Sequence, residues 1–244
     1  MSLRIYFCLV FLIFAAASAS AQVLPKAGTH FTFGIPEGPD ALTDPVLGSQ
    51  TSDLTLNIVS IYDGRGIITS PSGFCQDFTF TANKVTIISL PYSLMHLNDL
   101  GKTNKGIIVK TSQPANAVFH DFLSEAGEAT QIYPDEALDT SYRITSWGIF
   151  DDPGEDNHSQ FIVTATQDNT DVTITPSVQA LDNHPALIPI HTTLNRGECF
   201  IVKADIFSLP TSTSLSNSVV SSTKPVSVIA GNFLRQNFID HFIA

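Results

Sequence analysis

The stretch Asp168-Asn-Thr-Asp-Val172-Thr-Ile174-Thr-Pro176-Ser177 repeats an earlier one, Asp63-Gly-Arg-Gly-Ile67-Ile68-Thr-Ser-Pro71-Ser72. In both, a turn sequence is followed by β-branched residues and a proline, which is typical of a tight turn that opens a strand. Two further blocks repeat around this one in the same order: Phe31–Ile35 with Tyr142–Ile149, and Ile107–Phe119 with Ser218–Ala230. The sequence therefore predicts an internal duplication of roughly 110 residues, the length of one small domain.

Apolar and polar residues alternate through nearly the whole chain, in short stretches rich in β-branched and aromatic residues. Gly, Pro, Asn, Asp and Ser separate these stretches, as expected for strands joined by turns. Helix signals are weak and limited to a turn or two at Leu94–Leu100, Ser124–Ala129 and Pro134–Leu138. We therefore predict an all-β fold of two homologous β-sandwich modules, in tandem or packed together, over residues 22–125 and 126–244.

Prolines mark the strand boundaries at similar places in the two copies. Pro71 and Pro176 are expected to end strands, because proline cannot donate a hydrogen bond within a sheet. Pro114 and Pro225 are expected to begin the last strand of each copy, where the missing N–H costs least. The repeated residues are thus explained by strand boundaries, and none of them requires an active site.

The N-terminus is typical of a secretory signal peptide over residues 1–21. Arg4 gives a short positive region, Ile5–Ala17 is apolar, and Ala19-Ser20-Ala21 is a cleavage site of the A-x-A type. The mature chain would begin at Gln22. No later segment is long and apolar enough for a transmembrane helix, so we expect a secreted, extracellular protein without membrane insertion.

The net charge is -11, although only 14% of the residues are charged. A sparse acidic surface disfavours binding to nucleic acid and to anionic lipid. The hydrophobic fraction of 43% is enough for a buried core. Composition is therefore typical of a folded extracellular protein.

The cysteines and one glycosylation sequon are further features that depend on export of the chain. Cys8 would leave with the signal peptide, so Cys75 and Cys199 would remain. In an exported protein two cysteines favour a disulfide, here one that joins the two copies, with two unpaired buried thiols as the alternative. The sequon Asn157-His-Ser159 predicts glycosylation of Asn157 in a eukaryotic host.

Several blocks together resemble the N-terminal domain of IgGFc-binding proteins. They are the run Phe161–Pro176, the upstream Tyr133-Pro134-x-x-Ala137-Leu138-x-x-x-Tyr142, and the closing Lys224-Pro225-Val226-Ser-Val228-Ile-Ala-Gly231. The resemblance extends from about Gly28 to His241. It implies extracellular binding or adhesion in mucus or matrix, with a protein or glycoprotein ligand such as immunoglobulin or a mucin. No residue can be mapped to Fc binding.

The chain departs from that family near its end. Family members tend to carry a cysteine after the closing Gly and another before an Asp-His pair, whereas Asn232, Phe233 and Ile239 occupy this stretch here. Family members also continue past the pair that Asp240-His241 matches. The resemblance therefore implies either a chain truncated at its C-terminus or an incomplete gene product.

An acidic loop is the best candidate for a metal site. Asp151, Asp152, Glu155 and Asp156, with the amide of Asn157, offer the hard oxygen ligands that calcium prefers. The loop lacks EF-hand spacing, so a solvated acidic turn is the alternative. No other cofactor is expected.

Catalytic motifs are weak or missing in the sequence. Asp139-Thr140-Ser141 resembles the triplet of aspartic proteases, but it occurs once and does not follow an apolar strand, so a capped turn is favoured. No G-x-S-x-G elbow or histidine pair with zinc spacing occurs. We expect no catalytic residue and no enzyme activity.

Three functions remain open at this point. The first is a non-enzymatic binding or adhesion module that acts through the paired insertions Pro36–Thr51 and Asp151–His158, which differ most between the copies. The second is a carbohydrate-binding or carbohydrate-processing β-sandwich, for which Trp147, Asp151 and Asp152 are the candidates. The third is a structural spacer of a larger surface protein.

Overall fold

The regular structure of this protein is β-strand with two short 3-10 turns. The computed structural model describes residues 26–38, 53–96, 98–123, 126–146, 158–205 and 214–232. In these residues the turns are η1 (Tyr92–Leu94) and η2 (Asp135–Ala137). The predicted all-β fold is confirmed. None of the described helices is long and apolar enough to cross a membrane.

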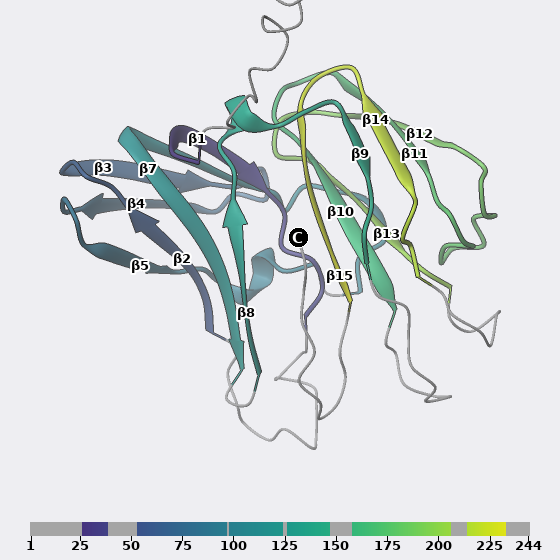
Figure 1. The fold of residues 1–244 in the computed structure, drawn as a ribbon, viewed down its shortest axis with the longest axis horizontal. Helices are drawn as coiled ribbons and strands as arrows, with labels where there is room; N and C mark the ends of the chain where they lie inside the picture. The colour runs from purple at the N-terminus through teal and green to yellow at the C-terminus, as the bar shows by residue number, and fades with distance from the viewer. Residues whose placement is uncertain are drawn as a thin grey trace, which may run out of the picture.

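Seven strands from the first half of the chain form one sheet, which we call the first unit (Figure 1). Its strands are β1 (Gly28–Phe33), β2 (Asp53–Val59), β3 (Gly64–Thr69), β4 (Cys75–Phe80), β5 (Val85–Ser89), β7 (Ile107–Leu123) and β8 (Ala126–Ile132). The long strand β7 takes part in two layers of the sheet. Its residues 107–111 pair with β1 and β3, whereas residues 116–123 pair with β2 and β8.

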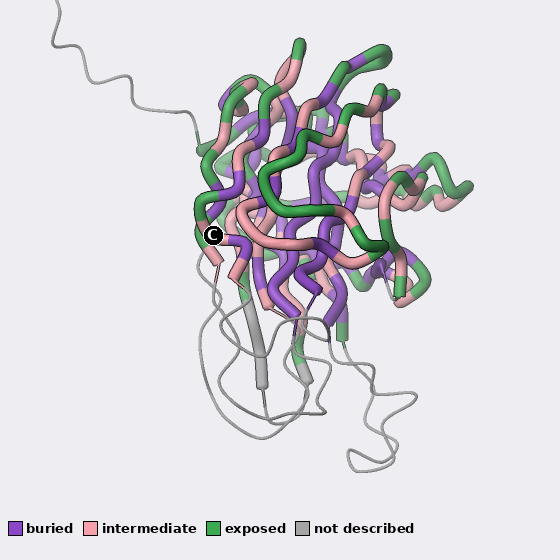
Figure 2. The backbone as a smooth tube through the Cα atoms, turned by 90° about the vertical axis from the view of Figure 1, so that its right-hand side faces the viewer, coloured by how far each residue is buried: buried purple, intermediate pink, exposed green. Residues whose placement is uncertain are grey.

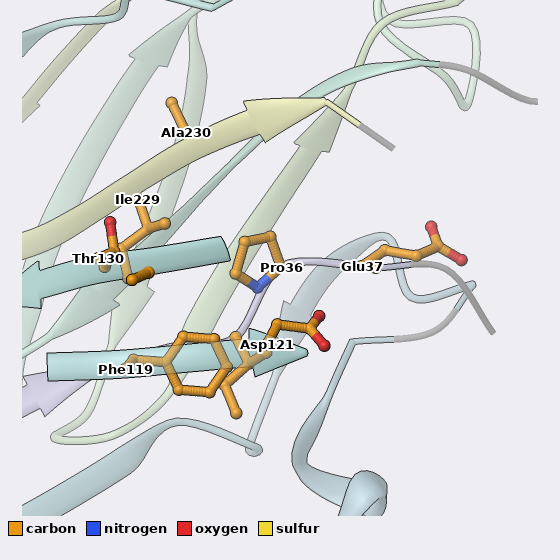
Figure 3. A pocket seen from close by; sticks show the side chains of 10 residues that line it. Pro36, Glu37, Phe119, Asp121, Thr130, Ile229 and Ala230 are labelled. Atoms are coloured by element: carbon orange, nitrogen blue, oxygen red, sulfur yellow. The ribbon is translucent and has the colours of Figure 1, made fainter. Parts of the chain in front are cut away.

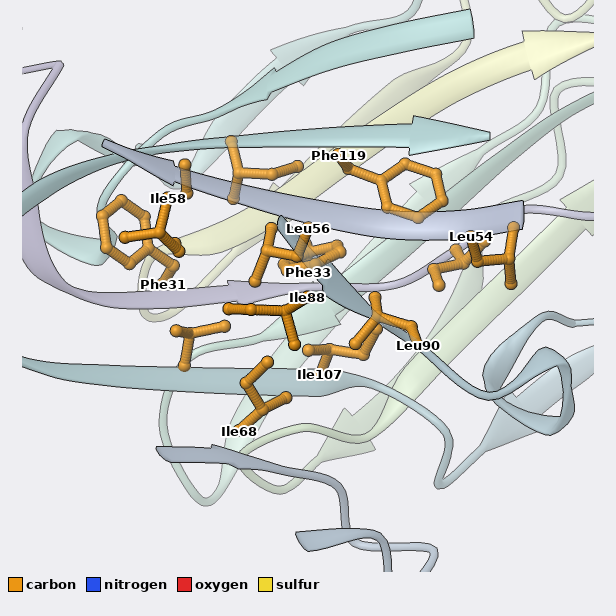
Figure 4. Close-up of a cluster of buried hydrophobic side chains, with 14 of the residues drawn as sticks. Phe31, Phe33, Leu54, Leu56, Ile58, Ile68, Ile88, Leu90, Ile107 and Phe119 are labelled. Atoms are coloured by element: carbon orange, nitrogen blue, oxygen red, sulfur yellow. The ribbon is translucent and has the colours of Figure 1, made fainter. Parts of the chain in front are cut away.

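The core of the first unit lies between these two layers (Figure 4). Phe31 and Phe33 of β1 pack with Leu56 and Ile58 of β2, and all four side chains are fully buried. The apolar residues of β2 occupy alternate positions, as a strand with one buried face requires. The sheet therefore folds over its own core, with β7 as the shared strand.

The second half of the chain, together with β6 from the first half, forms two four-stranded sheets, which we call the second unit. One has the order β15-β10-β13-β6 and the other the order β12-β11-β14-β9. The strands are β6 (Gly101–Thr103), β9 (Ser141–Arg143), β10 (Ser159–Ala165), β11 (Thr170–Thr175), β12 (Ile190–Leu194), β13 (Cys199–Lys203), β14 (Val219–Ser222) and β15 (Val226–Asn232). Figure 2 shows the buried residues running through the middle of the molecule.

The order in which strands pair in the first unit is repeated in the second unit. The series β4-β3-β7-β1 matches β12-β11-β14-β9, and β5-β2-β7 matches β13-β10-β15. Phe31 lies opposite Val109 in the first unit, and Tyr142 lies opposite Val220 in the second. These pairs are the ones that the repeated sequence blocks align.

One repeated block is shifted by a residue relative to our sequence alignment. Ile68 pairs with Val109 and Ile174 pairs with Val220, and both isoleucines are fully buried. Ile174 therefore matches Ile68 and not Thr69, as the alignment of the two stretches had it. A shift of one residue moves a side chain to the other face of the sheet, so burial decides the correct alignment.

Strands β6 and β8 lie in units other than those expected from the division at residues 125 and 126. β8 pairs with β7 of the first unit, although it follows the boundary. β6 precedes the boundary but pairs with β13 of the second unit, with Lys102 opposite Phe200. The units are thus connected by an exchanged strand.

Of three local predictions, two were wrong and one is confirmed. Residues 126–129 of the expected helical turn at Ser124–Ala129 are extended, because they pair with β7. Pro114 lies inside β7 instead of opening a strand, at the point where β7 passes from one layer to the other. The predicted turn at Pro134–Leu138 is confirmed as η2.

The units pack closely through glycines. A Cβ on Gly34 would lie 2.3 Å from Ile162 Cδ1, and one on Gly106 would lie 2.3 Å from the carbonyl oxygen of Gly197. The N–H of Gly106 donates to that same oxygen at 3.1 Å. The outward face of β10 and β13 is therefore buried, with Ile162, Cys199 and Ile201 in one cluster.

Candidate functional site

A small cleft lies where the two units meet (Figure 3). The segment after β1 contributes Ile35, Pro36, Glu37 and Gly38. The first unit also contributes residues of β7 and β8, and the second unit residues of β15. These are Phe119, Asp121, Ala129, Thr130, Ile229 and Ala230. The cavity of about 40 Å³ is far below the roughly 300–1,000 Å³ of small-molecule sites.

Edge strands border the cleft on both sides. Among the described residues, β8 pairs only with β7 in the first unit, and β15 pairs only with β10 in the second. Thr130 of β8 and Ala230 of β15 are half-buried at the border of the cleft. An edge strand presents unpaired backbone donors and acceptors, so this cleft combines an apolar centre with backbone hydrogen-bonding capacity.

Beneath the cleft, Glu37 is the centre of a buried polar network. Its carboxylate accepts hydrogen bonds from Lys203 Nζ and, at 2.9 Å, from the N–H of Asn98, and His158 Nε2 lies 3.3 Å from its Oε2. Its backbone N–H donates to Gln160 Oε1 at 3.1 Å, while Gln160 Nε2 donates to its carbonyl oxygen at 2.5 Å. The network joins the first unit to β10 and β13.

The charge on Glu37 is stabilised by this network. Burial by itself raises the pKa of Glu37, but the hydrogen bonds from His158, Lys203 and Asn98 outweigh burial and lower the pKa to about 2. A carboxylate held so firmly in its ionised form is a poor proton donor near neutral pH. Glu37 therefore positions the segment that forms the floor of the cleft.

His96 fixes the same segment from the other side. Its Nδ1 donates to the carbonyl oxygen of Ile35 at 2.7 Å, and its Nε2 accepts from Thr103 Oγ1 at 2.9 Å. Burial lowers the pKa of His96 to about 4. The ring is therefore neutral at physiological pH, which fits one donating and one accepting nitrogen.

The two insertions that the sequence singled out meet at this network. Glu37 belongs to Pro36–Thr51, and His158 ends Asp151–His158. Their side chains are 3.3 Å apart although 121 positions of sequence separate them, and both are buried. Residues 39–51 and 151–157 lie outside the described residues, so the contact is established for the ends of the insertions only.

Most predicted site residues lie outside the described part of the chain. These are Asp151, Asp152, Glu155 and Asp156 of the calcium loop, the sequon residue Asn157, Trp147, and the signal peptide at residues 1–21. Among the residues that the structure describes, no group of His, Cys, Asp and Glu could hold a metal ion.

The two cysteines are free thiols in the structure, so the expected bridge between Cys75 and Cys199 is not formed. Cys75 is exposed at the start of β4, whereas Cys199 is fully buried in β13 beside Thr164 Oγ1 at 3.2 Å. Burial raises the pKa of Cys199 to about 12. Cys199 therefore has the environment of an unreactive core thiol, so the alternative of two buried thiols holds for Cys199 but not for the exposed Cys75.

The first two residues of the triplet Asp139-Thr140-Ser141 form a bend that leads into β9, which begins at Ser141. The N–H of Thr140 donates to Asp139 Oδ1 at 2.6 Å, and the N–H of Asp139 donates to Tyr142 Oη at 2.7 Å. The Asp139 side chain thus caps the adjacent backbone as expected, but the segment is a bend and a strand start, not a turn.

Sequence reasoning missed Lys203 and Gln160 as partners of Glu37. Lys203 ends the otherwise apolar run of β13, and a charged residue there indicates a buried partner. The identity of that partner depends on contacts more than 100 residues away in the sequence, which periodicity does not reveal.

Residues 128–242 match the model of a family described as IgGFc binding protein. The matched stretch includes β9 to β15, with His158 and Lys203, whereas Glu37 and strands β1 to β7 precede it. The expected resemblance is therefore confirmed over the second part of the chain. Comparisons with curated proteins and with solved structures found no match.

Proposed function

We propose, from the match of residues 128–242 to the IgGFc-binding family, that this chain is a secreted, non-enzymatic module for binding or adhesion. Its ligand would be an extracellular protein or glycoprotein, with immunoglobulin Fc and mucin-like proteins as the first candidates. The chain would be exported through residues 1–21 and fold as two homologous β-sandwich modules. The repeated strand-pairing order supports the duplication.

We place the ligand contact at the cleft between β8 and β15. Phe119 and Ile229 give it an apolar centre, and Asp121 adds a carboxylate at its border. A cavity of this size accepts one protruding side chain of a protein better than a whole small molecule. The neighbouring edge strands offer backbone groups to an extended ligand segment, the mode of β-strand addition.

The absence of enzyme activity is inferred from the chemistry of the buried groups near the cleft. Glu37 stays ionised because its pKa is about 2, and His96 stays neutral because its pKa is about 4. Cys199 stays protonated because its pKa is about 12. None of the three has a pKa near neutral pH, where a general acid or base works best.

The decisive experiment measures binding of the purified chain to immobilised immunoglobulin Fc and to mucin, by surface plasmon resonance. Thr130→Arg and Ala230→Arg place bulky cations at the border of the cleft and should weaken binding at least about tenfold. Thr79→Arg on the distant, exposed strand β4 is the matched control and should bind as the wild type does.

Three results would overturn parts of the proposal. Binding that resists both cleft variants would place the ligand elsewhere on the surface. Failure to bind any extracellular protein or glycan, with and without a calcium chelator, would favour the spacer function. N-terminal sequencing of the secreted chain should find Gln22 first, and retention of Met1 would contradict export by cleavage.

A further inference from the structure

In the described part of the chain no strand pairs with the outward edge of β5, whereas the matching edge of the second unit is covered. β13 pairs with β10 on one side and with β6 on the other. β5 corresponds to β13 in the repeated order, yet among the described residues it pairs only with β2. The second unit thus shows that this edge accepts an antiparallel strand.

The backbone of β5 is oriented for a further pairing. The N–H of Leu90 donates to the carbonyl oxygen of Leu54, and the register continues with Ile88 opposite Leu56. Hydrogen-bonded positions alternate along an antiparallel strand, so Thr86, Ile88 and Leu90 face β2. Val85, Ile87 and Ser89 therefore direct their N–H and C=O groups toward the open edge.

The side chains of β5 do not protect this edge. Val85 is 60% exposed and Ile87 is 66% exposed, and β5 contains no charged residue and no proline. By contrast, Asp77 lies on the edge strand β4, Lys102 on β6 and Arg143 on β9. Charged residues on edge strands usually prevent pairing between molecules. β5 lacks them, and unlike the uncharged edge strands β12 and β15 it exposes two large apolar side chains.

We propose that β5 pairs with β5 of a second copy of this chain, which makes a symmetric dimer with a continuous sheet. A two-fold axis at Ile87 places Ile87 opposite its own counterpart and Val85 opposite Ser89. The backbone N–H and C=O of Ile87 point away from β2 at that position, so the central pair exchanges two hydrogen bonds. A two-fold interface requires a self-complementary surface, which this uncharged strand provides.

The charge of the whole chain predicts how the dimer responds to salt. Each copy carries a net charge of -11, so two copies repel each other at low ionic strength. Salt screens this repulsion without weakening the apolar and backbone contacts of β5. Dimerisation should therefore become tighter as the salt concentration rises.

The test is light scattering coupled to size-exclusion chromatography over a range of protein concentrations. The wild type should be a dimer, and Ile87→Lys and Val85→Lys should each weaken association at least about tenfold. Ile188→Lys is the matched control, because Ile188 is 52% exposed but lies outside the strands. Circular dichroism confirms that every variant is folded.

Hydrogen exchange locates the interface independently of any variant. The amides of Val85, Ile87 and Ser89 should become protected as the wild type dimerises, while exposed amides of β4 remain unchanged. A monomer at every concentration and salt level would overturn the proposal. So would a dimer that survives Ile87→Lys, or one without added protection in β5. None of these results bears on ligand binding at the cleft.

Discussion

In the second unit the outward face of β10 and β13 is buried against the first unit, whereas the matching face of the first unit is open to solvent. Ile162 is fully buried and Ile201 is 2% exposed, but Ile87 of β5 is 66% exposed. The same strand-pairing order therefore supports two different uses of one face. In the second unit the face is packing surface, and in the first unit it remains available to a partner.

The largest expected effect comes from breaking the ionic contact that joins the units. Lys203→Met leaves Glu37 buried without its cation, and this should cost about 3–5 kcal/mol of unfolding free energy in urea titrations. The double variant Glu37→Leu with Lys203→Met removes both charges and should recover most of the loss. Lys110→Met, at an exposed lysine of β7, is the control. A small loss for Lys203→Met would show that the network does not hold the units together.

Acid should weaken the contact between the units in two separate pH windows. His96 has a folded pKa of about 4 against 6.5 unfolded, so its contribution is present above pH 6.5 and is lost as pH falls toward 4. Glu37 has a folded pKa of about 2 against 4.5, so its contribution is lost between pH 4.5 and 2. Each is worth about 3 kcal/mol.

Urea unfolding at a series of pH values tests the two windows. His96→Gln should flatten the upper one and Glu37→Gln the lower one, each relative to the wild type. Identical pH slopes in wild type and variants would contradict the assignment.

The same small truncation on the two matching faces should have unequal effects. Ile162→Val removes a methylene from a buried cluster and should cost about 1 kcal/mol. Ile87→Val makes the same change on the open face of the first unit and should alter stability by less than about 0.5 kcal/mol in monomeric protein. Thermal unfolding at low protein concentration compares the two. Equal losses would mean that the open face is covered in solution.

The smallest effect is expected at the exposed ion pair that accompanies β6. Lys102 Nζ lies 2.8 Å from Glu198 Oε2 and also donates to the carbonyl oxygen of Thr193 at 3.0 Å. Because the lysine side chain is 42% exposed, Lys102→Ala should cost less than about 1 kcal/mol. The loss should shrink further in high salt. A larger loss of stability that does not depend on salt would mean that the Lys102 side chain, and not backbone pairing, holds β6 against β13.

Much of the fold follows from the sequence because strand alternation and turn residues are local signals. The duplication, the turn at η2 and most strands were predictable from them. β6 and β8 were not predictable from the sequence. Gly101–Thr103 is too short to show an alternation of apolar and polar residues, and Ala126–Ile132 has no such alternation. These segments are strands because they pair with β13 and β7, and their intrinsic strand propensity would not be sufficient.

The candidate site was predictable only in part. The loop comparison indicated the segments that begin at Pro36 and end at His158, and their described ends do meet. The cleft itself depends on β8 lying near β15, which follows from the packing of one unit on the other. No pattern in one sequence encodes that packing directly.

The short strand β6 has a consequence for cooperativity. It lies in the chain between β5 and β7 but completes a sheet of the second unit, and Thr103 on it holds His96 in place. Unfolding of the first unit therefore removes an edge from the second, and unfolding of the second releases the segment that His96 fixes. In space the molecule has two units, but we expect it to melt as one domain, and neither half should survive as a separate fragment.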